Sequence, residues 1–61
     1  MTEKEIIFSV IKELNGVKHL SKQQVSDFIE HIFYRLPIEE NYENNKIIID
    51  AIETYFKLQN I

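Results

Sequence analysis

Residues 47–58 read IIIDAIETYFKL, the most apolar stretch with a helical period in this 61-residue chain. At about 100° per residue, its apolar side chains cover roughly 200° of a helix, about twice the stripe of a helix that packs on one core. The middle of this arc is formed by Ile48, Ile52 and Tyr55, one edge by Ile47 and Leu58, and the other edge by Ile49 and Phe56. A helix this apolar has to contact more than one neighbour.

A first helix is predicted over residues 3–15. Thr2 and Glu5 have the spacing of a capping box, in which each side chain accepts a hydrogen bond from the other residue's backbone N–H. Gly16 suits the left-handed position just past a helix end. Phe8 lies roughly 60° outside the apolar face, where it either borders the core or contacts a partner. The expected core-facing residues are Ile6, Ile7, Val10, Ile11 and Leu14.

The second predicted helix spans residues 22–36. Ser21 and Gln24 form another capping box, and Pro37 disfavours helical backbone in the residue before it. The apolar stripe has the spacing i, i+3, i+4 of a helix that faces a core; its members are Val25, Phe28, Ile29, Ile32, Phe33 and Leu36.

The third predicted helix spans residues 43–59 and follows the acidic connection IEENYENN. Either Asn41 or Asn44 is expected to cap it, since asparagine is favoured at that position. Ile38 and Tyr42 are the only apolar residues of the connection, and we expect both to anchor it to the core.

Three amphipathic helices predict an all-α fold, a small three-helix bundle in a single domain over residues 1–61. The short link before the second helix predicts that the first two helices form an antiparallel or angled pair. The third helix is expected to be central, lying across both, with apolar side chains on about half of its circumference.

Composition narrows the classes of function. The net charge is −3, with ten acidic against seven basic residues, which argues against nonspecific binding of nucleic acid because that needs clustered lysine and arginine. There is no cysteine and no apolar run longer than three residues, so we expect a cytoplasmic protein without disulfides or a membrane span. Abundant isoleucine, asparagine and lysine indicate an AT-rich bacterium or one of its mobile elements as the source.

We do not expect an enzyme, a cofactor or a metal site. One glycine excludes a glycine-rich phosphate loop, and no serine or histidine stands in a nucleophile motif. Asp27 and His31 are one helical turn apart with Glu30 beside them, but a specific metal site normally needs three or four ligands. A solvated charged face is the expected arrangement there.

We expect the protein to act by binding another protein, as a regulator or inhibitor of the antitoxin, immunity or anti-defence type. Compact acidic helical proteins often present carboxylates to a basic site on a target, which is an association at the level of fold. Tyrosines flanked by acids are suitable anchors because aromatic residues are enriched among the residues that dominate binding. The candidate contact residues are Asp27, Glu30, Tyr34, Glu39, Glu40, Tyr42 and Glu43.

The alternative function is a helix-turn-helix-like transcriptional regulator that binds DNA through residues 16–30. Lys18, Lys22 and Gln23 would then contact phosphates and base edges. The negative net charge and the length of the turn argue against this alternative.

A homodimer is expected from the width of the apolar arc. Two short helices cover the middle of the arc and one edge more readily than all 200°. Either Ile47 with Leu58 or Ile49 with Phe56 is therefore expected to pack against the same edge of a second copy.

Overall fold

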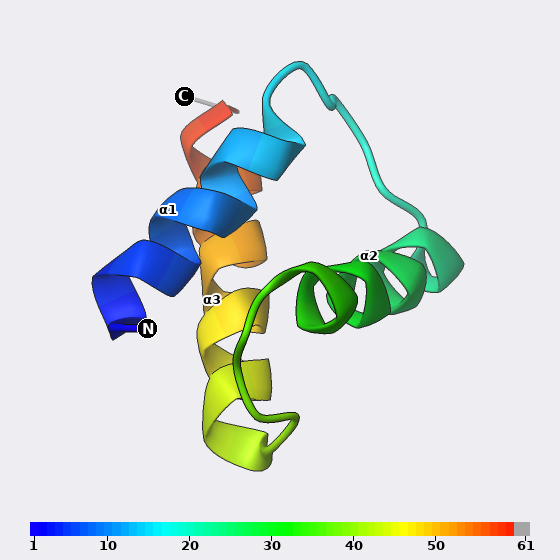
Figure 1. Ribbon diagram of the computed structural model, residues 1–61. Coiled ribbons are helices and arrows are strands. Elements are labelled where there is room, and N and C mark those ends of the chain that lie inside the picture. The colour runs from blue at the N-terminus through cyan, green and yellow to red at the C-terminus, as the bar shows by residue number, and fades with distance from the viewer. Residues whose placement is uncertain (60–61) are drawn as a thin grey trace.

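The computed structural model describes residues 1–59, which form three helices and a compact all-α bundle (Figure 1). Helix α1 is Glu3–Leu14, α2 is Lys22–Arg35 and α3 is Tyr42–Gln59. The predicted three-helix fold is confirmed, and every helix end lies within one residue of its predicted position.

Both predicted capping boxes are present. The hydroxyl of Thr2 accepts from the backbone N–H of Glu5 at 3.2 Å, and that of Ser21 accepts from the backbone N–H of Gln24 at 3.2 Å. In return, the side chains of Glu5 and Gln24 accept from the backbone N–H groups of Thr2 and Ser21. The backbone N–H and then the hydroxyl of Thr2, both donating to the Glu5 carboxylate, hold the pKa of that carboxyl below its ordinary value.

Removing the cap at Ser21 tests where α2 begins. Ser21→Ala should lower the free energy of unfolding by about 1 kcal/mol, because alanine cannot accept the N–H of Gln24. Ser26→Ala, an exposed change inside the same helix, is the control and should be neutral or slightly stabilising. Urea unfolding followed by circular dichroism measures both, and equal midpoints would show that α2 begins elsewhere.

Asn41 rather than Asn44 caps the third helix, which decides between the two predicted caps. The side-chain oxygen of Asn41 accepts the backbone N–H of Asn44 at 2.8 Å, and its backbone carbonyl accepts the N–H of Asn45 at 2.9 Å. The connection between α2 and α3 is residues 36–41, as long as the predicted helix bounds imply, and Tyr42 belongs to the helix.

The helices differ in how extensively they pack on one another. Figure 1 shows α1 lying along α3, with both running in the same general direction, while α2 lies beside this pair with its axis at a steep angle to theirs. The α1–α3 packing is the most extensive in the described chain, and α2 contacts α3 more sparsely. The sequence predicted an antiparallel or angled pair of α1 and α2, and it did not predict that α1 packs mainly on α3.

The link between α1 and α2 starts with the predicted left-handed glycine. Gly16 has a φ of 87°, which costs a residue without a Cβ little. The backbone N–H of Val17 donates to the carbonyl of Leu14 at 2.9 Å, and Val17 packs against the core. These contacts end α1 and turn the chain toward α2.

Among residues 1–59, seven residues are buried in the core, and α1 and α3 supply six of them. Helix α2 contributes one fully buried side chain, while its other apolar residues are partly buried around the core. The buried residues are Ile6, Val10, Leu14, Ile32, Ile48, Ala51 and Ile52. Helix α3 is thus the shared element of the core, as predicted.

Two residues of α1 face the solvent more than the sequence predicts. Ile11 was expected in the core but is 39% exposed, and Phe8 is 69% exposed. Because α1 packs mainly on α3, its buried stripe is narrow and is centred on Ile6 and Val10. Phe8 is largely exposed, which argues against the first of its two predicted positions, the border of the core, and its contact with a partner stays a prediction.

Candidate protein-binding site

A hollow of about 400 Å³ lies between α2 and the start of α3. Its lining comes from two turns of α2, from the connection and from the first turn of α3. The lining residues are Ile29, Glu30, Phe33, Glu40, Asn41, Tyr42 and Asn45. The fold thereby brings together Glu30, Glu40 and Tyr42, three of the seven predicted protein-binding residues.

The floor of this hollow is apolar. Ile29 and Phe33 stand one turn apart on α2, are partly buried, and also pack against the core. Sequence reasoning assigned both to the core alone, because an i, i+4 pair on an apolar stripe indicates burial. The structure shows that the same side chains serve the core and the hollow.

Tyr42 is more exposed than the sequence predicted. It was expected to anchor the connection to the core, yet it is 81% exposed. As the first residue of α3, it projects from the helix surface between the hollow and a second one that contains Glu3, Lys46 and Asp50. Ile38 packs against the core as predicted and anchors the connection.

Hydrogen bonds link residues of the connection, which forms one wall of the hollow. The side-chain amide of Asn41 donates to the Glu39 carboxylate at 3.0 Å, and that of Asn44 donates to the Glu39 carbonyl at 2.8 Å. Together with the cap of α3, these bonds link Glu39, Asn41 and Asn44 to one another. Asn41 was predicted only as a cap, and its place in the lining depends on the tertiary fold.

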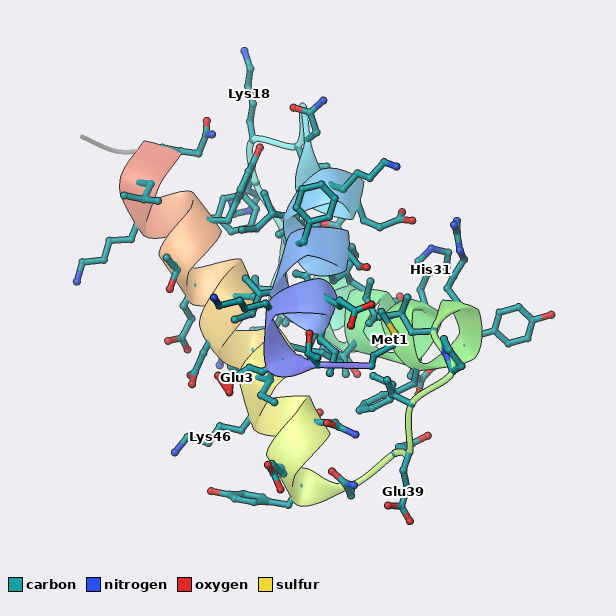
Figure 2. The ribbon with its side chains drawn as sticks, turned by 60° about the vertical axis from the view of Figure 1, so that its left-hand side comes forward. Met1, Glu3, Lys18, His31, Glu39 and Lys46 are labelled. Atoms are coloured by element: carbon teal, nitrogen blue, oxygen red, sulfur yellow. The ribbon has the colours of Figure 1, made fainter. Side chains whose placement is uncertain are left out.

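The charged residues that line the hollow are both acidic. Glu30 and Glu40 are exposed, and neither carboxylate pairs with a cation among residues 1–59. No lysine or arginine lines the hollow. Figure 2 shows Lys46 and Glu39 on opposite sides of the start of α3, so the nearest lysine of that helix points away from the connection.

The remaining predicted contact residues lie around the hollow rather than in it. Asp27 accepts a hydrogen bond from the Gln23 amide at 3.1 Å, and Tyr34 is exposed farther along α2. The Glu39 carboxylate accepts a hydrogen bond from Asn41 in the connection, and Glu43 lines the second hollow, on the other side of Tyr42. All four side chains are exposed, and their part in binding stays a prediction.

Sequence reasoning missed the bridge between α1 and α2. The Glu13 carboxylate of α1 forms an ion pair with Arg35 of α2 at 3.2 Å, and it also lies 3.6 Å from the Nε2 atom of His31. These contacts join the two helices where apolar packing between them is sparse, and nothing in the local sequence indicates which helix Glu13 faces.

The residues of the alternative DNA-binding function are exposed but belong to another part of the surface. Lys18 and Lys22 are exposed, and the Gln23 amide donates to Asp27. Figure 2 places Lys18 at the opposite end of the molecule from Glu39. DNA binding by this end of the protein stays a prediction.

The four residues predicted for the dimer interface differ in how far they are buried. Ile47 and Phe56 are partly buried and pack against the core, and Ile49 is partly buried. Leu58 is 62% exposed. Helices α1 and α2 thus cover more of the apolar arc than predicted, and Leu58 is its most exposed member.

Comparisons with known proteins add no assignment: no family model, curated protein or solved structure matches this chain. Across residues 1–59, no three histidine, aspartate or glutamate side chains are grouped as metal ligands. None of the three described helices is both long enough and apolar enough to cross a bilayer.

Proposed function

We propose that this protein acts by binding another protein through the surface that α2 and the start of α3 form together. The observation that carries the proposal is the hollow lined by Glu30, Glu40 and Tyr42, with an apolar floor and no cation. Binding surfaces commonly combine a buried apolar centre, an aromatic anchor and a polar rim. Tyr34 of α2 is a second exposed aromatic residue, one residue after Phe33 of the lining.

Such a surface suits a regulator or inhibitor of the antitoxin, immunity or anti-defence type in the cytoplasm of an AT-rich bacterium or its phage. The acidic net charge and small size support this class, which often covers a basic site on a target. Electrostatic complementarity of that kind speeds association and makes binding sensitive to salt.

Charge reversal tests the acidic connection. The triple variant Glu39→Lys, Glu40→Lys and Glu43→Lys should weaken partner binding about tenfold or more, since each rim charge contributes roughly 0.5 kcal/mol. A protein captured from a lysate of an AT-rich bacterium is the probe, and its affinity for each variant is then measured. Circular dichroism must show that the triple variant remains helical.

A second triple variant is the matched control. Glu3→Lys, Asp50→Lys and Glu53→Lys also take the net charge from −3 to +3, but they leave α2 and the connection unchanged. Their effect on affinity should be much smaller. Equal losses would mean that net charge alone governs binding, and unchanged affinity in the first variant would exclude the connection. Capture of duplex DNA that salt releases would favour the DNA-binding alternative instead.

We also propose that the protein self-associates through the exposed edge of α3. Leu58 supports this contact because it is a large apolar side chain left 62% exposed. A 61-residue chain buries a small core, so a second copy adds apolar burial that the monomer lacks.

A further inference from the structure

We propose that the hollow between α2 and α3 receives an arginine side chain of the partner protein. This inference rests on the proposed protein-binding function and names the chemical group that the site recognises. Its basis is the combination of an apolar floor, an exposed tyrosine and two unpaired carboxylates in one hollow of about 400 Å³.

The apolar floor matches the stem of such a side chain. Ile29 and Phe33 contribute partly buried carbon surface to the lining of the hollow, while the lining residues that carry charge are exposed. Arginine carries three methylene groups that pack on such surface while the charged head stays near the solvent. A short acidic or amide side chain would leave this floor uncovered.

The rim matches the guanidinium head. Glu30 approaches from α2 and Glu40 from the connection, and neither has a cationic partner within residues 1–59. A guanidinium presents five N–H donors in a plane, so it can bond more than one carboxylate and stack on an aromatic ring. Tyr42 supplies that ring beside the two acids.

The charge of the lining separates this hollow from three others in the described chain. The hollow between α1 and α2 contains Lys12 and Arg35, the one beside Glu3 contains Lys46, and the one beside Phe8 contains Lys4. Each of these already holds a cation that would repel a second one, although the hollow beside Glu3 also contains the carboxylates of Glu3, Glu43 and Asp50. The hollow at Glu30 and Glu40 differs from these three because it has acids and no cation.

The start of α3 is compatible with a bound cation. A helix N-terminus carries partial positive charge on its free N–H groups, which opposes a guanidinium. Here the Asn41 side chain accepts the N–H of Asn44, and Glu43 adds a negative charge in the first turn. The hydrogen bonds of Asn41 and Glu39 also hold the wall in place before binding, which reduces the ordering that binding requires.

The test is a titration of the ¹⁵N-labelled full-length chain with the tripeptide acetyl-Ala-Arg-Ala-amide, followed by NMR. Amide signals from residues 29–33 and 40–45 should move, with a dissociation constant in the millimolar range, about what a single side chain achieves. The citrulline tripeptide has the same shape without the charge and should bind at least tenfold more weakly. The lysine tripeptide should be weaker by a factor of about three or more, because an ammonium group lacks the planar fork.

Two double variants locate the effect. Glu30→Gln with Glu40→Gln should weaken arginine binding about tenfold while the spectrum stays that of the folded protein. Glu3→Gln with Glu53→Gln changes the net charge equally and should leave binding within twofold. The proposal is overturned if citrulline binds as well as arginine, if signals beside all acids move alike, or if both double variants behave the same.

The arginine site and the proposed function can fail separately. If a captured partner binds the Glu30→Gln and Glu40→Gln variant as tightly as the unaltered protein, the function stands and the arginine site is overturned. If signals of residues 40–45 move with protein concentration in the absence of peptide, a second copy occupies the hollow and the foreign partner is overturned. The peptide result itself needs no captured partner.

Discussion

Replacing Ile48 with alanine should lower the free energy of unfolding by about 2–5 kcal/mol. Ile48 is fully buried in the middle of α3, within the core that all three helices share. The change removes three carbon atoms and leaves a cavity that the neighbouring side chains fill only in part. A domain of this length has a total stability of roughly 3–9 kcal/mol, so a large fraction of the variant should be unfolded.

Ile11→Ala is the matched control for this prediction. It removes the same atoms from the interior of a helix and brings the same gain in helix propensity, but Ile11 is 39% exposed. Its cost should stay below about 1 kcal/mol. Urea unfolding followed by circular dichroism compares the two variants, and equal costs would mean that the centre of the core is not at Ile48.

The helix boundaries follow from local sequence. The capping boxes at Thr2 and Ser21 satisfy backbone donors within three residues of the cap, so short-range chemistry determines them. Gly16 and the apolar periods act over similar distances. These features explain why each predicted helix matches the structure to within one residue.

The pairing of the helices depends on contacts that are distant in sequence. Ile11 was misplaced because the buried width of α1 depends on which helix packs on it. A stripe at the period of 3.6 shows that a helix faces a core, but not which partner covers it. The ion pair between Glu13 and Arg35 also joins two different helices. The sequence alone does not show how those two helices are oriented, so it could not predict this pair.

The sequence predicted residues of the candidate site, but it did not predict that they lie together. The sequence placed Glu30 on the second helix and Glu40 with Tyr42 on the following connection, and it gave no distance between them. Their meeting in one hollow results from the way α2 lies across α3. Tyr42 was misassigned because an apolar residue in a connection is usually taken as an anchor, whereas here it begins a helix and stays exposed.

Introducing glutamate at the two edges of α3 should give opposite results. Phe56 packs against the core and meets Tyr55 edge to face, with ring centroids 5.3 Å apart. Phe56→Glu should cost about 3 kcal/mol or more, because it removes apolar packing and places a charge beside the core. Much of that variant should be unfolded at room temperature, as a loss of helical circular dichroism.

Leu58→Glu should instead give a folded monomer. Leu58 is 62% exposed, so the charge there meets solvent within one copy but disrupts an apolar contact between two copies. The melting temperature of the unaltered protein should rise by about 5 °C for each tenfold increase in concentration, whereas that of Leu58→Glu should stay constant. Thr54→Glu, an exposed change on the same helix, is the control and should keep the concentration dependence. A constant melting temperature and a monomeric mass of the unaltered protein at high micromolar concentration would contradict the dimer, and Leu58 would then be free to contact a foreign partner.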